Sequence, residues 1–171
     1  MNFNFLSPVS DNVLAHNELL SMQALGRRLQ IHSSQNGVPD LEGINIALLG
    51  IIENRNDVDY IGETFQLDEI RKSLYALFPG SWNTTIADLG DINAGETVED
   101  TYFALKETIE ILVRKNIIPV LLGGSQDLTY ANYRAYDAIM PMVNLVNVDC
   151  KFDLGDSAKP IKNTSFVGKV I

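Results

Sequence analysis

Four short, largely apolar runs constrain the fold of this chain more than any other feature of its sequence. They cover residues 44–51, 84–92, 117–124 and 142–150. Runs of this length are typical of strands that are buried on both faces of a parallel sheet. Because segments with helical periodicity separate them, we expect right-handed crossovers and a mostly parallel sheet between two helical layers. The sequence therefore predicts a three-layer α/β/α fold.

Apolar residues at three- and four-residue spacings mark the helices. We expect helices in residues 11–32, 67–78, 97–116 and 127–139, and a short one in 163–171 capped by Asn163 or Thr164. Thr97 stands where it would cap the third helix, with Asp100 at the capping-box position. Pro79 and Gly80 end the second helix. No repeat or linker interrupts this order, which predicts one domain over residues 1–171.

Net charge and cysteine content exclude several classes of protein. A net charge of −9 argues against nucleic acid and against an anionic membrane surface as partners. The single cysteine, Cys150, has no partner for an intramolecular disulfide. The first residues lack the basic and apolar stretches of a signal peptide, and no window approaches the roughly 20 apolar residues of a membrane span. We therefore expect a cytoplasmic protein.

Polar clusters follow three of the apolar runs. They read GDIN at 90–93, GGSQD at 123–127 and DCKFDLGD at 149–156. Ligands of open α/β sheets bind beyond the carboxyl ends of the strands, where neighbouring loops meet. We expect all three clusters to lie along one edge of the sheet, and this edge is the candidate functional site.

Residue types alone leave several interpretations of these clusters open. Asp149, Asp153 and Asp156 offer hard oxygen ligands to a divalent metal, but acidic residues in turns commonly only solvate a loop. Lys151 lies between the first two, and its ammonium would form a buried ion cluster with them if it takes the place of a cation.

The GGSQD cluster, at residues 123–127, also has several interpretations. It suits a glycine-assisted turn that caps a helix, and less well a phosphate-binding loop. Ser125 lacks an evident base, because His16 and His32 both lie in the predicted N-terminal helix.

Two segments in succession resemble a known family. The order IPVLLGGSQDLTYANYRAY, then VNLVNVDCKFDLGD, resembles the ureohydrolases: arginase, agmatinase and formimidoylglutamase. These enzymes carry Gly-Gly-Asp-His-Ser after one strand and Asp-Ala-His-x-Asp after the next. The earlier IALLGI and IADLGDI also resemble the family's first strand and its Leu-Gly-Asp segment, so the likeness covers about residues 44–156. Divergent formimidoylglutamase-like members look most similar. The resemblance implies an arginase-like fold, truncated and incomplete at the C-terminus.

The resemblance also implies a metal site. Ureohydrolases activate water with two bridged manganese ions, which lower the pKa of the water and position it. The family's metal positions fall at Gln126, Asp149, Lys151 and Asp153, so two histidines are replaced by glutamine and lysine. The family's later Asp-x-Asp segment would lie beyond Ile171. We therefore expect a degenerate site with no bound metal, and manganese only if the family site is retained. A rearranged site would recruit Asp127, Asp91 or Asp156 as auxiliary ligands.

The functional expectation is an arginase-like protein without the family's hydrolysis of amidines or guanidines, and no catalytic residue is assigned. One alternative is an active C–N hydrolase with an atypical metal site, acting on a linear amidine such as formimidoylglutamate or an arginine-like molecule. The other alternative is a binding or interaction protein that uses the arginase-like fold. A truncated sheet would leave an unpaired edge strand, so we also expect a homo-oligomer or a partner protein.

Overall fold

A five-stranded sheet forms the centre of the computed structural model, which describes residues 3–60, 65–139 and 142–171. The strands are β1 (Leu6–Ser7), β2 (Gln30–Ile31), β3 (Ile46–Ile52), β4 (Ile86–Asn93) and β5 (Ile118–Leu122). Their order is β1-β4-β3-β5, and β2 also pairs with β4. β3 runs parallel to both β4 and β5, as the crossovers predict, whereas the short β1 is antiparallel to β4.

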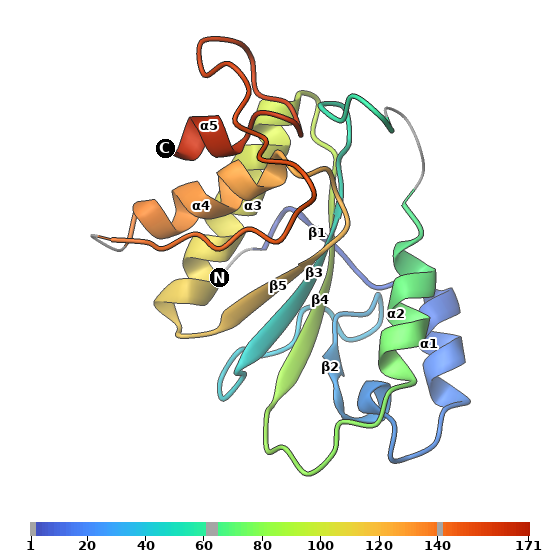
Figure 1. Cartoon of the computed structure of the whole chain (residues 1–171). Coiled ribbons are helices and arrows are strands. Elements are labelled where there is room, and N and C mark those ends of the chain that lie inside the picture. The colour runs from blue at the N-terminus through green and yellow to red at the C-terminus, as the bar shows by residue number, and fades with distance from the viewer. Residues whose placement is uncertain (1–2, 61–64, 140–141) are drawn as a thin grey trace.

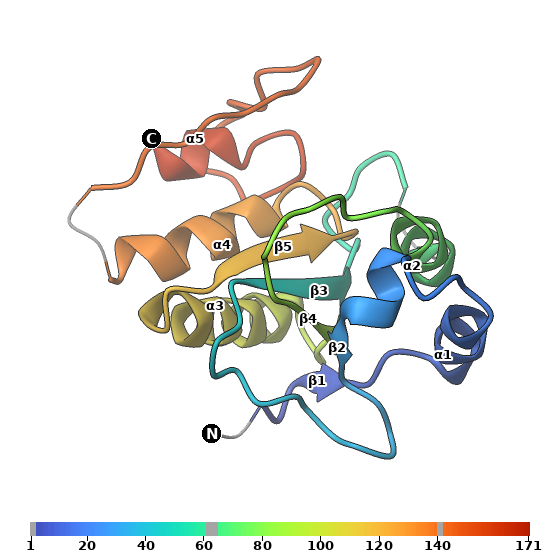
Figure 2. The same ribbon diagram turned by 90° about the horizontal axis from the view of Figure 1, so that it is seen from below.

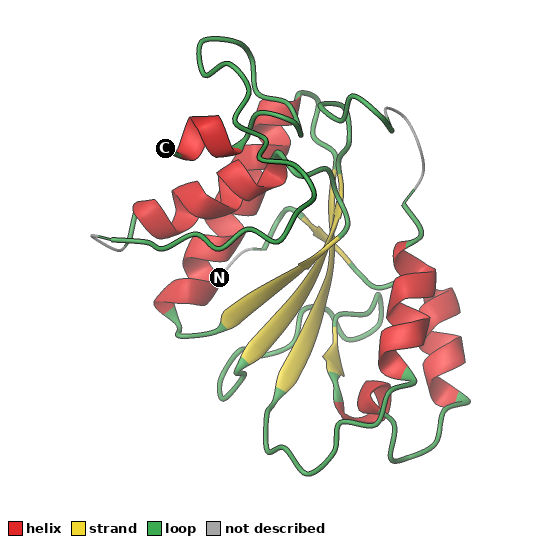
Figure 3. Ribbon diagram, in the orientation of Figure 1, coloured by secondary structure: helices red, strands yellow, loops and turns green. Residues whose placement is uncertain are grey.

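Helices cover both faces of this sheet, which confirms the predicted three-layer arrangement (Figures 1 and 3). They are α1 (Asp11–Glu18), the 3₁₀ helix η1 (Leu25–Arg28), α2 (Leu67–Tyr75), α3 (Val98–Arg114), α4 (Leu128–Asp137) and α5 (Val167–Val170). Helices α1 and α2 lie on one side of the sheet, and α3, α4 and α5 lie on the other (Figures 1 and 2). None of the described helices is both long and apolar enough to span a membrane.

The main hydrophobic core lies between the sheet and the layer formed by α3 and α4. Its fully buried members include Leu49 of β3, Leu89 of β4 and Leu105 of α3. Thr97 caps α3 as predicted: its hydroxyl accepts the N–H of Asp100, whose carboxylate accepts the N–H of Thr97 in return. This reciprocal cap sets where α3 begins, at the carboxyl end of the sheet.

The opposite face of β4 is polar where it meets α2. Arg71 of α2 is fully buried and donates to Asp88 at 2.8 Å and 3.2 Å, and to Asp91 at 2.7 Å. The hydroxyl of Tyr75 donates to the same Asp88 at 2.7 Å. Because a buried charge is tolerated only when it is paired and hydrogen-bonded, this cluster makes the position of α2 on the sheet specific.

The predicted helix over residues 11–32 is wrong beyond Glu18. The chain leaves α1, forms η1 and then pairs with β4 as β2. Asn17 donates to the carbonyl of Gly26 at 2.9 Å, and Gly26 lies so close to Asn17 and Tyr75 that a Cβ would clash with both. These tertiary contacts outweigh the local helical periodicity. His32 consequently lies outside the helix, where its Nδ1 hydrogen-bonds to the carbonyl of Leu89 at 2.9 Å.

The predicted fourth strand, residues 142–150, does not form. This segment is mostly exposed, with Val146 85% and Val148 96% accessible, and Figure 2 shows it passing on the α4 side, away from β5. An apolar run becomes a strand only when the backbone groups of a neighbouring strand are within reach. β5 itself pairs with β3 but is only partly buried, contrary to the expectation for its run.

The predicted cap of the last helix is also wrong. α5 begins at Val167 with Phe166 at the N-cap, and no side chain caps it. Asn163 instead binds the loop after β3, where its side chain accepts from the N–H of Val58 at 3.2 Å and donates to Asp57 at 3.2 Å.

Candidate functional site

Two of the three predicted clusters converge on one cavity of about 290 Å³. The loop after β3, the turn after β5 and the segments at 149–153 and 163–164 surround it. Its lining includes all four predicted metal positions: Gln126, Asp149, Lys151 and Asp153. The cluster GDIN does not line this cavity, because it belongs to β4 and its Asp91 pairs with Arg71.

The turn at residues 123–127 is built to bring Gln126 to this cavity. Gly123 and Gly124 have φ angles of 74° and 76°, which side chains with a Cβ rarely adopt. The backbone N–H of Ser125 donates to the carbonyl of Glu53 at 2.9 Å, so the turn is attached to the end of β3. Gln126 is exposed and lines the cavity.

Gln126 and Asp149 are in direct contact. The side-chain amide of Gln126 donates to one carboxylate oxygen of Asp149, and the backbone N–H of Lys151 donates to the other at 3.1 Å. The N–H of Lys151, followed by the Gln126 amide, holds the pKa of Asp149 below its usual range. Both oxygens of Asp149 therefore already accept hydrogen bonds from the protein.

Asp153 has an unusual environment. It is only 6% exposed, its φ of 46° is left-handed, and its Oδ2 has no hydrogen-bond donor among the described residues. Burial raises the pKa of Asp153, and the neighbouring Asp149 carboxyl raises it further, while Lys151 opposes them. The carboxyl of Asp153 is thus the least satisfied polar group that lines the cavity.

Lys151 does not sit between these two carboxylates. Its ammonium lies 3.8 Å from Asp59 on the loop after β3, and its side chain is 60% exposed. The predicted buried ion cluster of Lys151 with Asp149 and Asp153 is therefore wrong. The backbone turns at Asp153, so the extended geometry on which that prediction depended is lost.

The three auxiliary candidates do not line the cavity. Asp127 is fully buried beneath the turn, where it accepts from the hydroxyls of Tyr102 and Ser125. Asp91 pairs with Arg71 at 2.7 Å, and Asp156 caps the N–H of Ala158 at 3.0 Å at the surface. In this structure, recruitment of any of the three would require breaking contacts that they already make.

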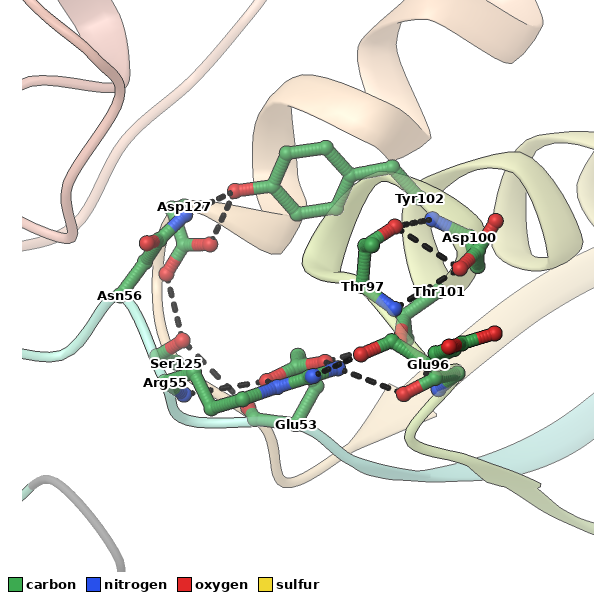
Figure 4. Close-up of polar contacts among 11 residues, drawn as sticks. Glu53, Arg55, Asn56, Glu96, Thr97, Asp100, Thr101, Tyr102, Ser125 and Asp127 are labelled. Atoms are coloured by element: carbon green, nitrogen blue, oxygen red, sulfur yellow. Dashed lines mark hydrogen bonds and ion pairs between the residues drawn. The ribbon is translucent and has the colours of Figure 1, made fainter.

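A second polar network joins the end of β3 to the start of α3, and sequence reasoning missed it (Figure 4). Glu53 follows β3 and is 2% exposed; it accepts from Arg55 at 2.6 Å and 3.0 Å and from Thr101 at 2.8 Å. Arg55 also donates to the carbonyls of Gly95 and Glu96, before α3. Burial alone would raise the pKa of Glu53, but the hydrogen bonds from Arg55 and Thr101 lower it. The sequence did contain one signal of this network, the charged residue Glu53 directly after an apolar run.

The network accounts for Ser125 as well. The hydroxyl of Ser125 donates to Asp127 and lies 3.4 Å from the carbonyl of Glu53. In the described part of the chain, Ser125 forms no hydrogen bond with a histidine: His32 is bound to Leu89 and His16 lies in α1. A serine nucleophile with a histidine base is not assembled here.

The side chains at the cavity do not fit a pair of manganese ions. Such a site needs several carboxylate or imidazole ligands for each ion, with the ligands themselves held by hydrogen bonds. No group of three or more His, Cys, Asp and Glu side chains in the described part of the chain is arranged to hold a metal. At this cavity only Asp149 and Asp153 are carboxylates at the family positions, and Gln126 directs its amide N–H at one of them.

Comparison with known proteins identifies one matching family and several relatives. A model of the arginase family matches residues 45–168. Formimidoylglutamase of Macrococcus caseolyticus is 28% identical over 131 residues, which are 73% of this chain and 42% of that protein. The human mitochondrial guanidino acid hydrolase is 28% identical over 128 residues, which are 68% of this chain and 36% of that protein.

Solved structures show the same fold. Trypanosoma cruzi formiminoglutamase, crystallised with Mn²⁺, superposes with a TM-score of 0.67 at 20% identity, over 77% of this chain and 48% of that one. Formimidoylglutamase of Bacillus subtilis superposes with a TM-score of 0.68 at 18% identity, over 78% and 45%. The chain thus spans less than half the length of each of these proteins.

Proposed function

Because the chain belongs to the arginase family, whose model matches residues 45–168, we propose that it carries the family's cavity without the family's dimanganese hydrolysis. The cavity would then bind a small molecule and would not cleave an amidine or guanidine. Four aspartates and one lysine line it, which favours a ligand with positive charge.

One observation carries this proposal: three of the four groups at the metal positions, Gln126, Asp149 and Lys151, already contact each other or other parts of the protein. Gln126 and the N–H of Lys151 occupy both oxygens of Asp149, and the Lys151 ammonium faces Asp59. A metal would have to displace the glutamine amide and would still find only two carboxylates at the family's metal positions, Asp149 and Asp153. The ammonium of Lys151 near the ions would add electrostatic repulsion.

Manganese is the relevant metal to test, because the Trypanosoma cruzi formiminoglutamase crystallised with it. The purified chain should hold well under one manganese ion after incubation with excess metal and removal of the free ions. Hydrolysis of arginine and of formimidoylglutamate, followed by chromatography of the amino-acid product, should stay at the background rate. Binding of arginine by calorimetry should weaken in Asp153→Asn, and Asp156→Asn is the matched control, since Asp156 is exposed outside the cavity.

A second candidate function is a hydrolase with a single, atypical metal ion. The unpartnered oxygen of Asp153 next to Asp149 favours it, because two adjacent carboxylates attract a cation. The same metal analysis separates the two functions. Stoichiometric manganese that is lost in Asp149→Asn but kept in Asp156→Asn, together with substrate turnover, would establish the hydrolase and refute the first proposal.

A further inference from the structure

The turn that carries Gln126 is held by a chain of hydroxyl and carboxylate groups that begins on α3 (Figure 4). The hydroxyl of Tyr102 donates to one oxygen of Asp127, and the hydroxyl of Ser125 donates to the other. Asn56, on the loop after β3, donates to the Tyr102 oxygen at 3.0 Å. Asp127 therefore links α3, the loop after β3 and the turn after β5.

Asp127 depends on these two hydroxyls. It is 0% exposed, and the described residues place no lysine or arginine within ion-pair distance of it. A buried carboxylate without a cation needs hydrogen-bond donors, and each missing donor leaves part of its charge unsatisfied. Burial, and then Asp127, raise the pKa of Tyr102, so this hydroxyl keeps its proton and donates at every physiological pH.

The rest of the turn is also restrained. Gly123 and Gly124 have left-handed backbones, and the N–H of Ser125 is bonded to the carbonyl of Glu53. Of residues 123–127, only Gln126 directs a long side chain to the cavity, where it contacts Asp149. The orientation of Gln126 is therefore set by the groups on either side of it.

We propose that Tyr102, Asp127 and Ser125 are positioning residues that hold the Gln126 side chain against Asp149 and so shape one wall of the cavity. This role goes beyond the proposed function, because it holds whether the cavity takes an organic cation, a metal ion or neither. Asp127 and Tyr102 would have this role although neither residue lines the cavity.

Two variants and one control test the contribution of Tyr102. Tyr102→Phe removes one donor to Asp127 and should lower the melting temperature by about 3 °C or more. It should also shift the side-chain amide ¹H–¹⁵N signal of Gln126, which Gln126→Ala identifies by its disappearance. Tyr130→Phe is the matched control, because among the described residues the Tyr130 hydroxyl accepts one hydrogen bond, from the exposed Arg134 at 3.2 Å. It should change neither quantity.

A reciprocal exchange tests the hydroxyl–carboxylate pair itself. Ser125→Asp alone places two buried carboxylates in contact, and Asp127→Ser alone removes the carboxylate from the pair. The double variant again has one carboxylate and one hydroxyl, so it should melt well above Ser125→Asp and return the Gln126 signal toward its parental position.

Two results would overturn this proposal. If Tyr102→Phe lowers the melting temperature but leaves the Gln126 amide signal in place, the chain of hydroxyls supports the fold without positioning Gln126. If the double variant is no more stable than Ser125→Asp, the pair is not the unit that holds the turn. Should Asp127→Ser fail to fold, Tyr102→Phe still decides the matter, since it preserves the aromatic ring.

Discussion

Arg71→Met should destabilise the protein strongly, because Arg71 is the cation of a buried ion cluster with Asp88 and Asp91. The side chains of Arg71 and Asp88 are both 0% exposed and that of Asp91 is 15% exposed, so the methionine would leave two carboxylates without their cation. Removing one partner of a buried ion pair costs about 3–5 kcal/mol. In the variant, Asp88 would still accept the hydrogen bond from the Tyr75 hydroxyl at 2.7 Å, and Asp91 would remain partly exposed to solvent. We therefore expect a loss of about 4 kcal/mol in the free energy of unfolding, and not twice that value for two unpaired carboxylates.

Thermal denaturation followed by circular dichroism would measure this effect. A cost of about 4 kcal/mol corresponds to a fall of roughly 8–16 °C in melting temperature for a chain of this size. Lys72→Met is the matched control on the same helix. Its ammonium pairs at 2.8 Å with Glu69, whose side chain is 63% exposed, and such surface pairs contribute about 1 kcal/mol or less.

The pH dependence provides an independent check of the cause. Burial raises the pKa of Asp91 although Arg71 opposes it, and removal of Arg71 should raise it further. An acid with a raised pKa in the folded state contributes stability below its unfolded pKa of about 3.9, and this stability is lost as pH rises through the folded pKa. The deficit of Arg71→Met should therefore be smallest near pH 4 and largest at pH 7. A variant as stable as Lys72→Met, or a deficit independent of pH, would refute the reasoning.

Two further predictions concern the sheet and its loops. Glu53→Gln should lower the free energy of unfolding by about 2 kcal/mol at pH 7, because Glu53 accepts charged hydrogen bonds from Arg55. The pKa of Glu53 is lowered, so this stability is present above its unfolded pKa of about 4.3 and is lost as pH falls through the folded pKa. Urea titrations of both proteins at pH 7 and pH 3 should show the deficit shrink, and an equal deficit at pH 3 would contradict the assignment. Gly90→Ala should destabilise more than Gly37→Ala, although their φ angles are 83° and 69°. A Cβ at Gly90 would lie 1.9 Å from the carbonyl oxygen of Ser7 on β1, whereas nothing lies within 4 Å of one at Gly37. Equal melting temperatures for the two variants would show that the close contact between β1 and β4 does not determine the cost of the Gly90 substitution.

Local patterns were reliable wherever neighbouring residues alone decide the structure. The apolar run at 44–51 forms β3, and Thr97 with Asp100 forms the predicted cap of α3. Residues 123–127 follow β5 and line the cavity as predicted, whereas residues 149–153 line it although the strand that was expected to lead into them does not form. In contrast, residues 142–150 are apolar enough for a strand, but strand formation requires a neighbour that no local pattern specifies.

The details of the site were beyond sequence reasoning for a related reason. The sequence gives the residue types at positions 126, 149, 151 and 153, but it does not show which residues they would form hydrogen bonds or ion pairs with. Lys151 pairs with Asp59, which is 92 residues earlier in the chain, and Asp127 is held by Tyr102 from another helix. Buried partners such as Arg71 and Asp88 are likewise brought together only by the packing of α2 on β4.

The sequence by itself determined the alternation of strands and helices, the capped start of α3 and the residue types at the cavity, because these depend on periodicity and on contacts within one turn of the chain. Only the tertiary structure decided which charges are paired, which apolar run stays outside the sheet and how Gln126 faces Asp149. Those outcomes depend on distances between segments far apart in sequence, and electrostatic and hydrogen-bond energies change steeply with such distances.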